Sequence, residues 1–236
     1  MEYNEMQELE KKPQKPKNKR KNIVWIFDIL GTVVALIAAV ISLVTLFEMK
    51  IQRNYAYMPT IVFETVEVTA DLKNSDKAAL YEGVKLPARN IGVGVAKRIS
   101  FKVETSNFVR WLDVYNDLYP ENAYQYEVDD GVATILRNGE TLGFSTDYET
   151  DKVFLLPNAE EAYEFVLPAQ YKVLLYEIYK NANTGMIDIP ELEIKVSYYD
   201  VQNVMYEETI HLSVKTTLFT MNGENEKLVT YQISMD

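Results

Sequence analysis

A nearly uncharged run of residues from Ile23 to Phe47, interrupted only by Asp28, constrains this chain more than any other feature. As an α-helix, about 25 residues rise roughly 37 Å, somewhat more than the ~30 Å hydrocarbon core of a bilayer. A span from Ile29 to Phe47 is still about 28 Å long, which places Asp28 at the headgroup boundary beside Trp25. The run is too long for a signal peptide and no small-x-small cleavage site follows it, so we expect an uncleaved signal-anchor.

A second interpretation of Asp28 comes from the small and polar residues of the same run. They recur about every 3.5 residues, which keeps one helical face toward a partner. These residues are Asp28, Thr32, Ala35, Ala39, Ser42 and Leu46. Gly31, Ala35 and Ala39 also form a small-xxx-small series that lets two backbones approach closely. The sequence therefore allows Asp28 to be a boundary residue or part of a face that pairs with a second copy or another membrane protein.

The basic residues beside the apolar run predict its orientation in the membrane. Seven lie within residues 1–22, whereas only Lys50 and Arg53 follow closely after the run. This asymmetry predicts a cytoplasmic N-terminus and an extracytoplasmic C-terminal domain in the cell membrane, with the lipid bilayer as partner. Residues 1–22 are rich in lysine and poor in apolar side chains, and we expect them to form a disordered basic tail.

The charge of the remaining chain excludes one class of partner. The chain carries −11 in total, of which residues 1–22 contribute +3 and Asp28 contributes −1, leaving −13 after the helix. A domain this acidic repels phosphate backbones, so we expect no nucleic acid partner. The chain has no cysteine, which excludes disulfides and thiolate chemistry.

The residues after the apolar run alternate in the manner of strands. Thr60–Thr69 and Ala96–Thr105 alternate apolar and polar side chains, and six further short strands are predicted near 124–128, 132–137, 161–168, 191–200, 205–216 and 228–234. Two amphipathic helices, Asn107–Tyr119 and Pro168–Gly185, interrupt them. We predict a transmembrane helix over 23–47, a linker over 48–58, and over 59–236 a mainly β domain: an antiparallel β-sandwich with two helical insertions.

The stretch "ARNIGVGVAKRISFKV" contains an N-x-G-x-G-x-A pattern at Asn90, Gly92, Gly94 and Ala96. It resembles a signature that joins the second and third strands of the Ig-like β-sandwich in bacterial single-pass membrane proteins of unassigned role. Pro59 before the first strand, and the Y-x-D turn that ends at Asp200, fit the same pattern. The resemblance implies an Ig-like architecture and carries over no catalytic residue.

The residues of this pattern have a physical role of their own. Asn90 can bond its own backbone and turn the chain, while Gly92 and Gly94 permit special dihedral angles or a close approach of strands. We therefore interpret the pattern as a folding device.

A search for catalytic or metal-binding motifs finds none. His211 is the only histidine and lies within a predicted strand. Asp147, Glu149 and Asp151 have the first spacings of a calcium loop, but Lys152 replaces its glycine and Asn158 its final glutamate. We expect a solvated acidic loop there, with weak calcium binding left open. The chain is predicted not to be an enzyme and to have no metal or cofactor.

Aromatic residues are the remaining candidates for a binding surface. Tyrosine occurs 17 times, and one short region holds Trp111, Tyr115, Tyr119, Tyr124 and Tyr126. Such side chains mark protein interfaces and sugar-stacking platforms, and they also form ordinary helix-on-sheet cores. An envelope protein or a glycan is the partner that a surface of this kind predicts.

These observations favour a membrane-anchored, non-enzymatic interaction or accessory module that displays an acidic extracytoplasmic sandwich. Two alternatives stay open: an enzyme or metal-dependent sensor on the same sandwich, and a membrane effector whose sandwich faces the cytoplasm. A cleft with converging polar side chains would favour the first alternative, and a flat aromatic patch would favour the interaction module.

Overall fold

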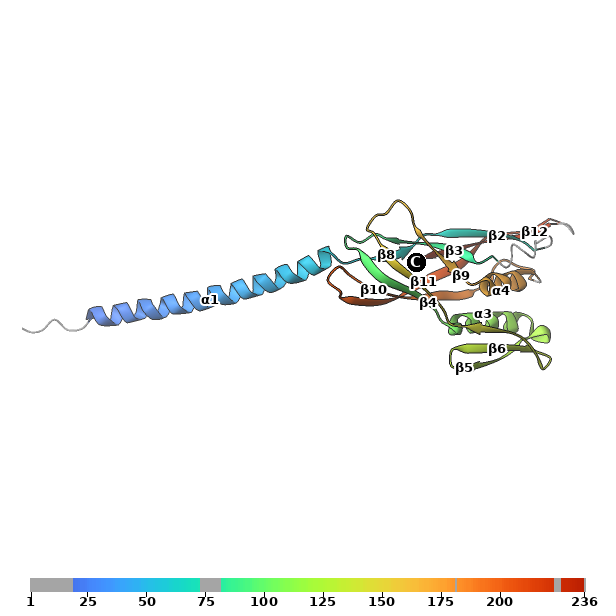
Figure 1. Cartoon of the computed structure of the whole chain (residues 1–236), viewed down its shortest axis with the longest axis horizontal. Helices are drawn as coiled ribbons and strands as arrows, with labels where there is room; N and C mark the ends of the chain where they lie inside the picture. Colours follow the sequence, from blue (N-terminus) through green and yellow to red (C-terminus); the bar gives the residue numbers. More distant parts are fainter. Residues whose placement is uncertain (1–18, 73–81, 181, 223–225, 236) are drawn as a thin grey trace, which may run out of the picture. The chain divides into compact units, whose positions relative to one another are not determined.

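The computed structural model describes residues 19–72, 82–180, 182–222 and 226–235 (Figure 1). The chain divides into two compact units, Met1–Arg53 and Asn54–Asp236, which are described separately below. Residues 1–18, most of the predicted basic tail, lie outside the described residues.

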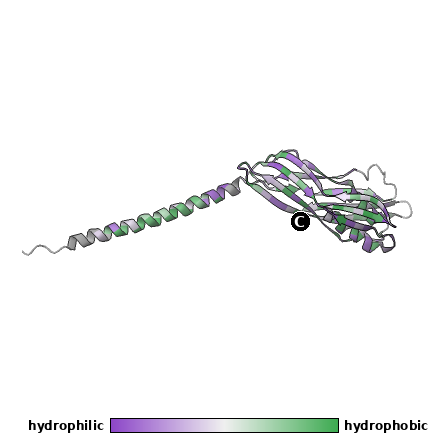
Figure 2. Ribbon diagram, turned by 60° about the horizontal axis from the view of Figure 1, so that its bottom comes forward, coloured by the Kyte–Doolittle hydropathy of each residue, from purple (hydrophilic) through white to green (hydrophobic). Residues whose placement is uncertain are grey.

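The first unit consists of helix α1, which spans Lys19–Ala56 and continues slightly into the second unit. Its segment Phe27–Arg53 is long and apolar enough to cross a membrane, and none of the most apolar window is buried; Figure 2 colours most of it as hydrophobic. The helix is longer than predicted, because residues 48–56, expected to be a linker, are helical. These residues include Glu, Met, Lys, Gln and Arg, which favour helix, and no proline occurs between Lys19 and Pro59.

The second unit is a β-sandwich made of two facing antiparallel sheets, which confirms the predicted fold class. The smaller sheet has the order β1-β3-β9, with β1 at Ile61–Phe63, β3 at Val84–Asn90 and β9 at Tyr163–Leu167. The larger sheet has the order β2-β12-β11-β10-β4-β8. Its strands are β2 (Val66–Asp71), β4 (Ala96–Val103), β8 (Tyr148–Leu155), β10 (Ile189–Tyr199), β11 (Met205–Asn222) and β12 (Glu226–Met235).

The predicted first strand, residues 60–69, is divided between the two sheets. β1 belongs to the smaller sheet and β2 to the larger one, and the chain crosses between them at Glu64 and Thr65. Odd-numbered residues of β1 are buried, whereas in β2 the more buried residues are the even-numbered ones. The change follows because the inner faces of the two sheets point in opposite directions.

Three strands were not predicted: β3, β8 and β7 at Glu140–Thr146. β8 corrects the expected acidic loop, because Glu149 and Asp151 lie in a strand paired with β4. β8 is an edge strand, and charged residues on such an edge oppose pairing with other chains. These charges are the reason why the segment has the composition of a loop.

The core lies between the two sheets and is rich in aromatic rings. Phe63, Phe101 and Phe165 come from β1, β4 and β9, and their ring centroids lie 5.7 to 6.0 Å apart. All three side chains are buried. Such ring pairs contribute about 0.5–1.5 kcal/mol each beyond the area that they bury, so this cluster fastens the two sheets together.

The N-x-G-x-G-x-A segment connects β3 of the smaller sheet to β4 of the larger one. Asn90 is buried; its amide donates to the carbonyl oxygens of Gly94 and Leu155, and its Oδ1 accepts from the backbone amides of Thr60 and Gly92. A Cβ atom on Gly94 would overlap the carbonyl oxygen of Tyr57. The backbone dihedrals of neither glycine of the segment lie in the left-handed region, so close approach is the reason for glycine here.

Helices and a third sheet cover one end of the sandwich (Figure 1). α3 spans Thr105–Leu118, a short 3-10 turn η1 spans Pro120–Asn122, and α4 spans Ala169–Lys180. The third sheet has the order β5-β6-β7, with β5 at Gln125–Asp129 and β6 at Val132–Arg137. We call α3, α4 and this third sheet the cap. The hairpin predicted near 124–137 therefore exists, but in the cap and not in the sandwich.

Candidate functional site

Two of the five aromatic residues predicted to form a binding surface belong to the core instead. Trp111 and Tyr115 lie on α3 and are 0% and 3% exposed. The indole Nε1 of Trp111 donates to the carbonyl oxygen of Pro190 at 2.8 Å, which fixes α3 to the start of β10. The prediction is wrong for these two residues, because the i, i+4 spacing that made them conspicuous is also the spacing of a buried helical face.

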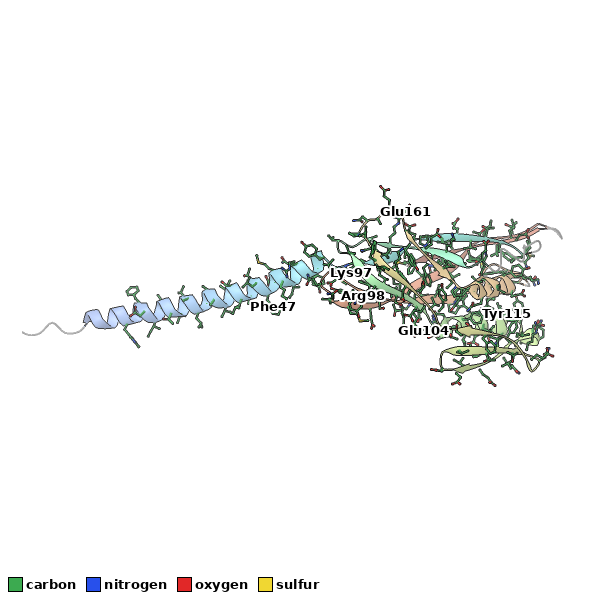
Figure 3. The ribbon with its side chains drawn as sticks, viewed as in Figure 1. Phe47, Lys97, Arg98, Glu104, Tyr115 and Glu161 are labelled. Carbon is green, nitrogen blue, oxygen red and sulfur yellow. The ribbon has the colours of Figure 1, made fainter. Side chains whose placement is uncertain are left out.

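The other three aromatic residues are half-buried and hold the cap together. The Tyr115 ring lies 5.1 Å from the rings of both Tyr119 and Tyr124. The Tyr119 hydroxyl donates to the carbonyl oxygen of Ile178 at 2.7 Å, which links α3 to α4. The Tyr126 hydroxyl donates to Asp113 at 2.9 Å, and this hydrogen bond raises the pKa of Tyr126. Figure 3 labels Tyr115 within the cap.

An apolar pocket of about 210 Å³ lies between α3, α4 and the third sheet. Eight of its nine lining residues are apolar, aromatic or glycine, and the ninth is Glu177. The lining residues are Phe108, Leu112, Tyr124, Ile135, Leu142, Gly143, Val173, Leu174 and Glu177. Its volume is below the ~300–1,000 Å³ of typical small-molecule sites, so it is suited to one or two apolar side chains.

The local sequence explains why a pocket remains here. Tyr171 of α4 packs edge-on against Phe108 and Trp111, with ring centroids 5.6 and 5.1 Å away, and so locks α4 onto α3. On the opposite wall, Gly143 of β7 contributes no side chain, and a Cβ atom there would meet nothing within 4 Å. The register between β6 and β7 shifts next to Ile135, directly beside this glycine. The missing side chain leaves the space open.

The rim of the pocket combines one cation with one exposed apolar side chain. The guanidinium of Arg137 lies 5.5 Å from the Tyr124 ring centroid and donates to Asn122. Leu142 of the lining is 56% exposed, whereas Phe144, paired with Thr134, lies on the other face of β7 from the buried Ser145 and so faces away from the pocket. An apolar pocket with an exposed apolar residue in its lining is typical of a surface that binds another protein.

Two of the three acidic residues considered for calcium, Asp147 and Glu149, are engaged in structural contacts, Glu149 with the hydroxyl of Ser100. Asp147 accepts from the backbone amide of Thr105, 2.9 Å away, at the start of α3, and pairs with the Lys102 ammonium at 2.8 Å. Burial alone would raise the pKa of Asp147, but the bonds to Lys102 and Thr105 outweigh it and lower the pKa. In the described ranges, no three His, Cys, Asp or Glu side chains are grouped to hold a metal ion.

The single histidine also has a structural neighbour. His211 lies on β11, and its Nδ1 is 3.3 Å from a carboxylate oxygen of Glu191. Both side chains are about half exposed. The arrangement is that of a cross-strand surface contact.

The five residues predicted for helix pairing all lie exposed on α1. They are Asp28, Gly31, Thr32, Ala35 and Ala39. The Thr32 hydroxyl donates to the backbone carbonyl oxygen of Asp28 at 2.8 Å, so it is already satisfied within its own helix. Pairing through this face stays a prediction.

These features define a class of protein: an apolar helix long enough to cross a membrane, followed by an Ig-like β-sandwich with a cap. Residues 24–218 match the model of a family described as "Domain of unknown function (DUF8453)". The chain belongs to this family. The match runs from α1 into β11 and so includes the apolar helix, most of the sandwich and the cap.

The chain is also similar to curated histidine–tRNA ligases of the genus Pyrobaculum. It is 28% identical over 156 residues to the ligase of Pyrobaculum aerophilum, covering 64% of this chain and 35% of the ligase. It is 28% identical over 153 residues to the ligase of Pyrobaculum islandicum, covering 62% of this chain and 34% of the ligase. The chain thus spans about a third of the length of these relatives. No solved structure matches.

The similarity corrects one of our predictions. The chain was predicted not to be an enzyme, whereas the curated relatives are enzymes, which indicates a distant relationship to an enzyme family. That prediction rested on the absence of short catalytic motifs, and such motifs do not report distant similarity over a long alignment.

Proposed function

We propose that this protein is a membrane-anchored interaction module that uses the pocket of its cap to hold apolar side chains of an envelope protein. The observation that carries the proposal is the apolar pocket with the exposed Leu142 in its lining. The apolar helix α1 supports the anchor, since its segment Phe27–Arg53 has the length and composition of a membrane span.

The size of the pocket sets the kind of binding that we expect. Burying one Leu or Phe side chain contributes about 1.5–3 kcal/mol, too little for stable association alone. The exposed Leu142 would add contact area around that anchor. We therefore expect a partner that inserts one or two apolar side chains and rests its flanks on β7.

A variant at Gly143 tests the pocket directly. Gly143→Leu places a side chain in the open space, and the backbone there is free of left-handed strain. The full chain in detergent would be titrated with N-phenyl-1-naphthylamine, a neutral apolar dye whose fluorescence rises in apolar surroundings, and the rise in protein-free micelles would be subtracted. We expect Gly143→Leu to lose most of that rise. Glu127→Leu, which adds the same side chain to β5 outside the pocket, should retain it.

The same two variants link the pocket to a partner. Proteins that co-purify with the wild type in detergent and with Glu127→Leu, but not with Gly143→Leu, are candidates for the envelope partner. Retention of both dye and partners by Gly143→Leu would contradict the proposal.

The extracytoplasmic location of the sandwich is part of the proposal and rests on the seven-to-two distribution of basic residues around the span. External protease added to intact spheroplasts should digest the sandwich and leave a fragment containing the N-terminus and α1. Protection of the sandwich until lysis would favour the membrane effector with a cytoplasmic sandwich.

The similarity to histidine–tRNA ligases favours a second candidate, in which the chain shares one module with these enzymes. The acidic charge of the sandwich opposes contact with a tRNA backbone but leaves binding of a small substrate open. Histidine-dependent exchange of pyrophosphate with ATP, measured with the purified full chain, decides this point. Exchange above the level without histidine would support the second candidate.

A further inference from the structure

Three chain connections meet at the end of the sandwich where the chain enters β1. Asn90 of β3 pairs with Ile61, Ala96 of β4 with Leu155, and Tyr199 of β10 with Lys97. The segments that leave these strand ends are residues 91–95, 156–162 and 200–204. They therefore converge on one end of the sandwich, beside the chain entry at Pro59.

The tips of these connections carry exposed apolar side chains. Each of them is 45% to 67% exposed. They are Ile91, Val93, Leu156, Val201, Val204 and, at the start of β11, Met205. Loops usually present polar residues to water, so three apolar loop tips at one end indicate a surface that is covered in the assembled protein.

Lys97 and Arg98 lie among these tips because β4 is irregular there. Arg98 has a φ of 48°, and the register between β4 and β10 shifts here, because Arg98 and Ile99 of β4 lie opposite Tyr198 alone, as in a β-bulge. Lys97 and Arg98 consequently both face outward between the buried Ala96 and Ile99. A left-handed backbone at a non-glycine residue persists only where the surrounding structure enforces it, and it often accompanies function.

Neighbouring groups hold both cations at this end. The Lys97 ammonium donates to the carbonyl oxygen of Val201 and to Oδ1 of Asn203. The Arg98 guanidinium lies 5.8 Å from the ring centroid of Tyr199. Figure 3 labels Lys97 and Arg98 close together, with Glu161 projecting well away from them. This end thus presents two positioned cations, although its connections also carry Glu160, Glu161 and the buried Asp200.

The chain leaves little distance between this end and the apolar helix. α1 ends at Ala56 and β1 begins at Ile61, so four residues, 57–60, connect them. Four residues reach at most about 14 Å, and the helical residues after Phe47 add about 14 Å more. If α1 spans a membrane, the end of the sandwich lies within about 30 Å of the hydrocarbon boundary.

We propose that this end of the sandwich is a membrane-contacting surface: its apolar tips enter the headgroup layer, and Lys97 and Arg98 meet the phosphates of anionic lipids. The inference rests on the proposed membrane anchor. Separate apolar tips without a groove fit a planar, deformable partner, and local cations fit an anionic one. The contact would hold the sandwich by its entry end and leave the cap, at the other end of β10, free for a partner.

The absence of cysteine from the chain permits a direct test. Val93→Cys, Val204→Cys and, as a control, Met186→Cys would each carry one environment-sensitive nitrobenzoxadiazole fluorophore. Met186 is 95% exposed and precedes β10 at its far end. Each full chain would be placed in nanodiscs that contain lipid with a nitroxide headgroup. We expect the fluorophores at positions 93 and 204 to lose fluorescence and the one at 186 to keep it.

The outcomes separate the two proposals. Incorporation into nanodiscs with equal fluorescence at all three positions would overturn the membrane contact and leave the anchor standing. Failure to incorporate would overturn the anchor itself.

A charge variant tests the role of anionic lipid. Lys97→Gln with Arg98→Gln, in the Val93→Cys chain, should weaken quenching in discs with phosphatidylglycerol and leave it unchanged in phosphatidylcholine. The matched control is Lys85→Gln with Lys180→Gln, which removes two cations away from the entry end, one near the start of β3 and one at the end of α4. Equal effects of the two pairs would overturn the lipid-phosphate part of the inference.

Discussion

At the residue scale, Asn90 shows why the N-x-G-x-G-x-A pattern needs its particular side chains. Its amide group makes four hydrogen bonds while it is almost completely buried. A buried amide with all these partners satisfied joins β1, β3, the end of β8 and the following loop at one point. A shorter or apolar side chain would leave backbone donors and acceptors of three segments without partners.

Gly94 should tolerate no side chain, because a Cβ atom there would overlap the carbonyl oxygen of Tyr57. We expect Gly94→Ala to lower the free energy of unfolding by about 1–3 kcal/mol, since backbone must move to admit the methyl group. Urea denaturation of the full chain in detergent measures the change. Gly143→Ala is the control, because its Cβ would meet nothing within 4 Å. Equal denaturation midpoints for the two variants would contradict this explanation.

Glu208 is a second residue whose surroundings make a prediction. It lies directly opposite the buried Val196 and so on the inner face of β11, and its Oε1 atom is buried without a hydrogen-bond partner. Burial raises the pKa of Glu208, only partly offset by the Tyr198 hydroxyl. A raised folded-state pKa means that stability falls as the pH rises from the unfolded value of 4.5 through the folded one.

Glu208→Gln should remove this dependence. We expect the variant to be more stable than the wild type at neutral pH, by up to about 1 kcal/mol, and the difference to vanish near pH 4. Glu207→Gln, on the outer face of the same strand, is the control and should change little. A stability difference that stays constant with pH would show that charge burial is not the cause.

At the level of elements, the start of α3 depends on Asp147, which lies between β7 and β8. Asp147 follows β7, accepts the Thr105 amide and pairs with Lys102 of β4. A carboxylate at a helix N-terminus satisfies an unpaired amide and interacts favourably with the helix dipole. One side chain thus joins the cap to the sandwich.

Asp147→Asn should weaken this joint by about 1 kcal/mol at neutral pH, because the amide can still accept a hydrogen bond but carries no charge. The pKa of Asp147 is lowered, so its contribution is complete above the unfolded value of 3.8 and is lost as the pH falls below it. The free energy of unfolding of the variant should therefore differ clearly from that of the wild type at pH 7 and much less near pH 3, as measured by denaturation at both pH values. Asp117→Asn, at the other end of α3, serves as the control.

At the level of the whole chain, the predicted pairing face of α1 makes a prediction about association between copies. Gly31→Leu with Ala35→Leu should abolish self-association in a membrane reporter, because Leu blocks close backbone approach. Val34→Leu with Ile37→Leu, on other positions of α1, should have little effect. Equal results for both pairs would leave α1 as a plain anchor.

Asp28→Leu separates the two roles that the sequence leaves for this acid. If Asp28 is a boundary residue, replacing it should leave the association of α1 unchanged, which is the result that we expect. An acid within the pairing face would shift association by about 0.5–2 kcal/mol. The same reporter measures both.

The sequence by itself determined the features that depend on local periodicity. The apolar run from Ile23 to Phe47 predicted the long helix, and alternation predicted β4, β10 and most of β11 and β12. Asn90 with its glycines predicted a close turn. In each case neighbouring residues carry the whole signal, because burial on one face repeats every two residues in a strand and about every 3.6 in a helix.

The tertiary structure decided which elements meet. It divided the strand over 60–69 between two sheets, placed β8 at an edge where its charges are tolerated, and buried Trp111 and Tyr115 that the sequence had offered as a surface. It also left the pocket beside Gly143 open and brought three apolar loop tips to one end. These outcomes depend on residues far apart in the chain, and the free energy of burial is set by the neighbours that packing brings together and not by the side chain alone.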